Sequence, residues 1–146
     1  MRLHRKSKVV QLCVPAVYTT AIDGQNAAVD TTGFEEMLVV VNLGAMSASL
    51  SLTVTMTQSD EAAANFAALP ASAQTGINPR ALALLTADAS TVIVGYYNLK
   101  SLKRYLKPTE ILNGNSAAYG MNMVLFGPDD SVKTNDTNQP LEPDGT

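Results

Sequence analysis

The residues that most often carry catalytic chemistry are scarce in this 146-residue sequence. His4 is the only histidine and Cys13 is the only cysteine. A serine or cysteine nucleophile needs a nearby base, and a metal centre on a β-fold needs several histidine or carboxylate ligands. Either arrangement would have to use His4, which lies in a basic terminal segment where we expect no rigid site. We therefore predict that the chain is not an enzyme and binds no metal or cofactor.

Two adjacent pairs of acids have the side chains of a general acid and base. They are Glu35-Glu36 and Asp60-Glu61. Neighbouring residues of a strand point to opposite faces, and acids in the first turn of a helix stabilise its positive end. Both pairs are therefore better explained by structure than by catalysis.

One segment, residues 96–107, combines basic and aromatic side chains, which together stack on and neutralise a nucleic-acid strand. A net charge of −3 and the lack of a second such segment argue against nucleic acid. Two interpretations remain: half-buried tyrosines beneath surface cations, or a contact with protein, because Tyr and Arg are enriched at interface hot spots. The interface candidates in this segment are Tyr96, Tyr97, Lys103, Arg104 and Tyr105.

The two ends of the chain carry opposite charge. Four of the ten basic residues lie in the first eight positions, and five of the thirteen acids lie in the last eighteen. This distribution predicts a basic arm over residues 1–8, a β-sandwich domain over 9–127 and an acidic, Pro/Asn-rich tail over 128–146. Such termini either contact neighbouring proteins or are solvated. The cations of the arm are further interface candidates: Arg2, Arg5, Lys6 and Lys8.

The composition fits one small, sparsely charged domain. Hydrophobic residues make up 46% of the chain and charged residues 16%, against about 25% charged in average soluble proteins. A surface poor in charge and rich in Ala, Ser and Thr is typical of a protein packed against others. No run of about 18 apolar residues is present to span a membrane. A lone cysteine in an apolar strand predicts a small core residue and an intracellular product.

Short antiparallel strands are predicted for most of the chain. Leu50, Leu52, Val54 and Met56 alternate with Ser or Thr, which predicts a strand with one buried face. The apolar run Glu36–Leu43 predicts a strand that is buried on both faces or central in its sheet and that forms a hairpin with the Leu50–Met56 strand. Further strands are expected at residues 9–14, 16–20, 91–97, 102–112 and 117–126, with 81–85 as a short helix or an edge strand.

One short helix is predicted at residues 59–69. Ser59 has the side chain of an N-cap, acids follow it, four alanines favour helix, and Pro70 ends the segment. Asn-Gly-Asn at 113–115 predicts a second hairpin. The predicted fold class is all-β: an antiparallel β-sandwich of jelly-roll type with one short helix and an extended C-terminal tail.

Three stretches of the sequence resemble small structural proteins of tailed bacteriophages. They read VDTTGFEEMLVVVNLGAM, SLTVTMTQSDEAAANF and VGYYNLKSLKRYLKP. In that group a strand of the type TTGFE…VVNLG precedes a strand ending in QSD, and a KRY strand follows further on. The matching positions are Thr31–Glu35, Val40–Gly44, Gln58–Asp60 and Lys103–Tyr105, and the resemblance covers roughly residues 16–127. The chain departs from the group in extra residues before Lys103 and in its long acidic tail.

This resemblance implies a capsid decoration, or cement, protein. Such proteins look like β-sandwich or jelly-roll modules on the outside of the shell, often trimers at three-fold or quasi-three-fold positions. The resemblance implies the major capsid protein and sister copies as partners, no nucleic acid or membrane, and a place on the capsid surface of a virion made in the host cytoplasm. Two alternatives remain open: a tail or head–tail joining protein, and a trimeric β-fold enzyme or carbohydrate-binding module. The single histidine and the lack of tryptophan disfavour the last of these.

Overall fold

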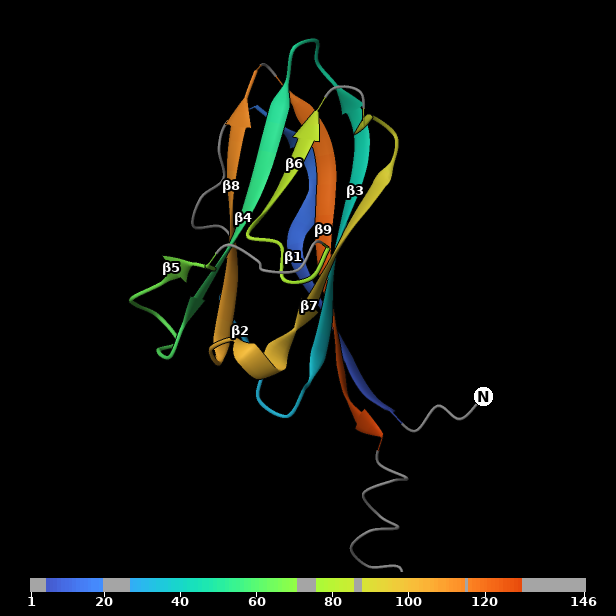
Figure 1. Ribbon diagram of the computed structural model, residues 1–146. Helices are drawn as coiled ribbons and strands as arrows, with labels where there is room; N and C mark the ends of the chain where they lie inside the picture. The colour runs from blue at the N-terminus through green and yellow to red at the C-terminus, as the bar shows by residue number, and fades with distance from the viewer. Residues whose placement is uncertain (1–4, 20–26, 71–75, 86–87, 115, 130–146) are drawn as a thin grey trace, which may run out of the picture.

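Two antiparallel sheets packed face to face form this protein, as a computed structural model shows (Figure 1). The structure describes residues 5–19, 27–70, 76–85, 88–114 and 116–129. The elements are β1 Arg5–Tyr18, β2 Val29–Asp30, β3 Glu36–Met46, β4 Ser51–Ser59, β5 Ala67–Ala68, β6 Ala81–Leu85, β7 Val92–Asn98, the 3-10 helix η2 Leu99–Ser101, β8 Tyr105–Asn113 and β9 Ala117–Asp129. One sheet has the strand order β1-β9-β3-β7. The other has the order β2-β8-β4-β5, and β6 also pairs with β4.

The strands pair in a nested order along the chain. β1 pairs with β9, β2 with β8, β3 with β7 and β4 with β6, and every pairing is antiparallel. A long hairpin rolled up on itself produces this nesting, and the result is the two-sheet arrangement of a jelly roll. The predicted all-β antiparallel sandwich is therefore confirmed.

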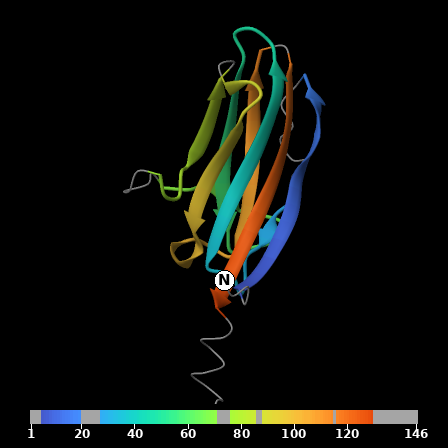
Figure 2. The same ribbon diagram turned by 90° about the vertical axis from the view of Figure 1, so that its right-hand side faces the viewer.

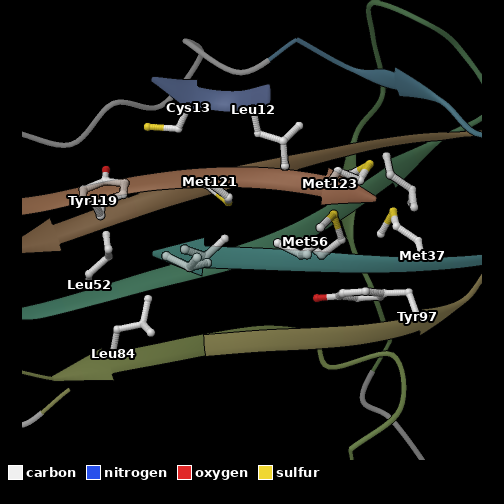
Figure 3. Packing of buried hydrophobic residues seen from close by; sticks show 14 of the residues in the cluster. Leu12, Cys13, Met37, Leu52, Met56, Leu84, Tyr97, Tyr119, Met121 and Met123 are labelled. Carbon is white, nitrogen blue, oxygen red and sulfur yellow. The ribbon is translucent and has the colours of Figure 1, made fainter. Parts of the chain in front are cut away.

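The core lies between the two sheets, where each contributes one face (Figure 3). Leu52, Val54 and Met56 of β4, and Leu50 just before it, are at most 2% exposed, so the predicted alternation is confirmed. Methionines fill much of the space opposite them, as their unbranched side chains adapt to irregular gaps. The other sheet contributes mainly residues of β3 and β9: Met37, Val39, Val41, Tyr119, Met121, Met123 and Leu125.

Cys13 is a core residue, as predicted. Its side chain is 5% exposed, and its thiol donates to the Tyr18 hydroxyl at 3.3 Å. Burial raises the pKa of the thiol, and the charge of the buried Glu110 acts in the same direction. The thiol therefore stays protonated and unreactive at neutral pH.

Both predicted hairpins are wrong. β3 and β4 are consecutive but lie in different sheets, and so do β8 and β9. Each of these turns crosses the sandwich, and the two crossings lie side by side: Ser47 N–H donates to the Ser116 carbonyl at 2.9 Å. Gly114 has φ of +119°, and a Cβ there would lie 3.0 Å from Leu50 Cα. The turn chemistry was correct, but it reverses the chain between layers because each strand finds its partners elsewhere.

The helix predicted at residues 59–69 is also wrong. β4 ends at Ser59, a bend follows, and β5 returns the chain to pair with β4. The Ser59 hydroxyl accepts the Glu61 N–H at 3.0 Å and donates to the Ala64 carbonyl at 2.6 Å. Ser59 therefore organises the bend that follows it, and pairing with β4 takes the place of a helix.

The first strand is longer than predicted. Residues 9–14 and 16–20 were expected as two strands, but β1 is continuous from Arg5 to Tyr18, with irregular register on both sides of Cys13. Pro15 fits there because β1 is an edge strand. Residues 5–8 of the predicted arm are therefore strand, whereas residues 1–4 and 130–146 lie outside the described residues. Of the two alternatives for residues 81–85, the edge strand is the one observed, as β6.

A candidate protein-contact surface at one end of the sandwich

The described interface candidates come from distant parts of the sequence and lie toward one end of the sandwich. Glu36 at the start of β3 pairs with Asn98 at the end of β7 and with Phe126 near the end of β9. Phe126 in turn pairs with Ser7 near the start of β1. Figure 1 shows η2 and the beginning of β1 at this lower end of the molecule. We name residues 30–36, 58–61 and 98–105 the ion-paired end.

Arg104 is held in a fixed position at the ion-paired end. Its Nε and Nη2 donate to the two carboxylate oxygens of Asp30 at 3.0 and 2.8 Å, and its guanidinium carbon lies 5.0 Å from the ring centre of Tyr105. Hydrogen bonds from Arg104, and then from Thr32, lower the pKa of Asp30. A two-pronged pair of this kind fixes the plane of the guanidinium, unlike a single-point contact.

Backbone hydrogen bonds hold the same corner together. The N–H and the hydroxyl of Thr31 both donate to the Arg104 carbonyl, at 3.0 and 2.7 Å. The N–H of Lys103 donates to Gln58 Oε1 at 2.9 Å, and the N–H of Leu99 donates to the Glu35 carbonyl at 2.8 Å. Three of the four short stretches that carry the phage resemblance therefore meet here, since residues 31–35 and 58–60 each contact residues 103–105.

The cations of residues 96–107 are largely matched by acids. Lys103 Nζ lies 3.0 Å from Asp60 Oδ2, and Lys100 Nζ lies 3.9 Å from Glu35 Oε1. These pairs are exposed, so each stabilises the fold by at most about 1 kcal/mol. A phosphate backbone would have to compete with these carboxylates. The arrangement therefore favours contact with a protein, whose own charges can exchange with the pairs, over contact with a polyanion.

The three tyrosines of the segment have different environments. Tyr97 is 1% exposed and its hydroxyl donates to the Pro79 carbonyl at 2.9 Å, so Tyr97 is a core residue and its selection as an interface candidate was wrong. Its inward direction follows from the alternation of β7, in which Gly95 is also buried. Tyr96 points to the opposite face, where its hydroxyl donates to Glu36 Oε1 at 2.7 Å. Tyr105 is partly exposed beneath Arg104.

The basic arm residues enter this end as a strand. Arg5 pairs in register with Asp129, and Lys8 pairs with Leu125, so the oppositely charged ends of the domain are neighbours. Lys8 is exposed; Lys6 also belongs to β1, and Arg2 lies outside the described residues. The acidic partners at this end are not predictable from the sequence, because no local pattern links Asp30 to Arg104 across the chain.

Metal ligands do not gather at this end. Across the described residues, no three His, Cys, Asp or Glu side chains lie close enough together to hold a metal ion. No helix in the same part of the chain is long and apolar enough to cross a membrane.

Comparison with known proteins extends the account of the fold. No family model and no curated protein matches this sequence. Among solved structures, the crystal structure of the SPBc2 prophage-derived protein YomS matches with a TM-score of 0.51 at 11% sequence identity, over 87% of this chain and 98% of that chain. The likeness is one of fold. The structure of infectious bursal disease virus, Gx strain, matches with a TM-score of 0.27 at 9% identity over 84% of this chain and 32% of that chain. A TM-score this low does not indicate a shared fold.

Proposed function

We propose that this protein is a structural component of a phage particle that binds the outer surface of the capsid and stabilises the shell. The observation that carries the proposal is the meeting of residues 31–35, 58–60 and 103–105 at the ion-paired end. These stretches resemble capsid decoration proteins, and their side chains form one ordered, partly exposed corner. The fold shared with a prophage-derived protein over nearly its whole length supports a phage origin.

Bridging, rather than chemistry, is the mechanism that we propose. A filled head exerts outward pressure, and a rigid module bound across several shell subunits adds contacts that must break before the subunits separate. A homotrimer at a three-fold or quasi-three-fold position does this well, because its three modest contacts act together and gain from effective concentration. The rigid sandwich keeps these contacts at fixed spacing.

We assign the shell contact to the ion-paired end. Arg104 and Lys103 are exposed there and ordered by Asp30 and Asp60. Charges at the rim of an interface steer association and set its orientation, and their effect weakens with salt. Arg5 and Asp129, which pair with each other, lie at the same end of the sandwich.

Cosedimentation with capsids that lack the protein tests this assignment. The purified protein is expected to bind saturably, and Arg104→Ala is expected to weaken binding about tenfold, the loss of one well-placed interface arginine. Thr53→Ala, on the outer face of the other end of β4, is the matched control and should bind like wild type. Absence of saturable binding would contradict the function. Equal binding by both variants would contradict the assignment of the contact.

The alternative function is that of a joining or tail protein, and the copy number per particle distinguishes it from a decoration protein. A decoration protein is expected at a copy number comparable to that of the shell subunit, whereas a joining or tail component is present in far fewer copies. Quantitative mass spectrometry of purified particles measures this ratio directly. A count of only a few copies per particle would overturn the decoration assignment.

A further inference from the structure

The outer faces of the two sheets differ in chemistry. The outer face of the β2-β8-β4 sheet carries mainly hydroxylated and charged residues, Ser51, Thr53, Thr55, Lys107 and Thr109, although Ile111 of β8 and Leu85 of β6 are exposed apolar residues. The outer face of the β1-β9-β3-β7 sheet, which Figure 2 turns toward the viewer, is more apolar, with Gln11, Asn42, Asn98 and Asn122 among its outward polar residues. Its outward residues include Val9, Leu38, Val40, Val92, Val94, Tyr96, Val124 and Phe126.

These apolar side chains form a continuous ridge across all four strands. Val9 on β1 pairs with Val124 on β9, which pairs with Leu38 on β3, which pairs with Tyr96 on β7. The next outward row has Val40 on β3 and Val94 on β7, followed by Asn122 on β9 and Gln11 on β1. Val9 is 67% and Val94 52% exposed, and the other four apolar residues are partly exposed. The ridge, defined as these six apolar residues, is therefore partly open to solvent in the single chain.

A hollow lies on the same face toward the opposite end of the sandwich. Small residues line its floor, Gly44, Ala118 and Gly120, and Pro15 and Val17 stand beside it. Its volume is about 330 Å³ and its lining is mainly apolar, with Asn42 as its polar side chain. A Cβ at Gly120 would lie 2.8 Å from Pro15 Cγ, so this glycine lets the edge strand approach the sheet closely.

Charge is nearly absent from this face. Among the described outward residues of β3, β7 and β9, Glu36 is the only charged one, and it accepts a hydrogen bond from the Tyr96 hydroxyl. A copy of the same face placed opposite therefore meets no extended field of like charge. Contiguous exposed apolar surface of this kind marks interaction sites rather than free surface in soluble proteins.

The size of the face suits contact with another protein. Four strands spaced about 4.8 Å apart and about 30 Å long give roughly 600 Å² of sheet. A stable interface removes about 800 Å² of accessible surface from each partner, and a corrugated face exposes more than its flat area. One whole face of this sheet therefore supplies most of the area that self-association needs.

We propose that a second copy of this chain covers the outer face of the β1-β9-β3-β7 sheet, with the ridge of one copy against the hollow of the other. Ridge and hollow are separate patches on one face, so a two-fold axis through that face sets the ridge of each copy against the hollow of the other. The proposal deepens the proposed function by assigning where sister copies meet, and it leaves the ion-paired end free for the shell. Its test uses the protein without capsids, so its failure is distinguishable from failure of capsid binding.

Sedimentation equilibrium of wild type and two glutamate variants, from about 1 to about 100 µM protein, tests the proposal. Val94→Glu places a charge on the ridge, and Thr53→Glu places the same charge outward on the other sheet. Wild type should associate, Val94→Glu should weaken association at least tenfold, and Thr53→Glu should leave it unchanged. Circular dichroism of each variant checks that it is folded.

A gentler variant keeps the test decisive if Val94→Glu does not fold. Val40→Thr combined with Val94→Thr keeps both side chains β-branched and gives this face the hydroxyls of the other one. It should also weaken association, with an unchanged circular dichroism spectrum. A wild-type monomer at the highest concentration, or equal association of wild type and the ridge variants, would overturn the proposal.

Discussion

Shortening one core side chain of β4 provides a quantitative test of the sandwich. Leu52 is completely buried, whereas its neighbour Thr53 points outward and is partly exposed. Leu52→Ala removes buried methyl and methylene groups and leaves a cavity, which costs about 2–5 kcal/mol. Thr53→Ala removes no core contact. It should lower the free energy of unfolding by no more than about 1 kcal/mol, which is the range of strand propensities among residue types.

Urea unfolding of both variants at one protein concentration measures this difference. Total stability of a domain of this size is about 5–15 kcal/mol, so Leu52→Ala should lower the midpoint strongly without changing the slope. Because association also adds to stability, the comparison belongs at the lowest concentration that gives a signal. Equal destabilisation by the two substitutions would refute the assignment of the buried face.

Three further outcomes follow from individual contacts. Burial raises the pKa of Tyr97, so the free energy of unfolding should fall as the pH rises above the unfolded value of about 10. In alkaline urea titrations the free energy of unfolding of Tyr97→Phe should fall less steeply with pH than that of wild type. Near neutral pH this variant should be less stable by about 0.5–1.5 kcal/mol, because it lacks one hydrogen bond. The pKa of Asp30 is lowered by Arg104, so the stabilisation by this pair is complete above the unfolded value of about pH 4 and is lost progressively as the pH falls from there toward the lowered pKa. The melting temperatures of wild type and Arg104→Ala should therefore converge on acidification, and a constant gap would contradict the pairing. Gly120→Val should weaken the packing of β1 against β9, because a Cβ at this position lies 2.8 Å from Pro15 Cγ. The rate of amide hydrogen exchange in β1 should therefore rise, and an unchanged rate would contradict the close packing.

Strand positions were largely predictable because the alternation of apolar and hydroxylated residues records which face of a strand is buried. Residues 50–56 show this, since every second residue of this stretch enters the core. Strand partners were not predictable from the turns. Gly114 marks a real reversal, but its turn joins two sheets, and only the long-range pairing of β8 with β4 and of β9 with β3 decides this.

The helix prediction failed for a similar reason. Local preference at Ser59 and the alanines after it favours a helical turn, but β5 gains ladder hydrogen bonds with β4 instead. Tertiary pairing outweighed a preference of a few tenths of a kcal/mol per residue. The Ser59 hydroxyl still accepts a backbone N–H, which is the part of the prediction that depends only on neighbouring residues.

The contact surface could be predicted only in part. The sequence singled out Lys103, Arg104 and Tyr105, which are exposed or partly exposed at the ion-paired end. It could not supply Asp30 and Asp60, because ion pairs across loops leave no periodic signal. The apolar outer face could not be recognised from the sequence either. An apolar run such as Glu36–Leu43 predicts a strand that is buried on both faces, but the run does not tell whether the second face is covered by the same chain or by another chain.

Heat rupture of filled particles tests the central claim most directly. Particles that lack this protein should assemble normally, release their DNA at a lower temperature than complete particles, and recover the original rupture temperature when the purified protein is added back. Dye accessibility of the DNA during a temperature ramp reports the rupture. Identical rupture temperatures with and without the protein would contradict a stabilising role on the shell.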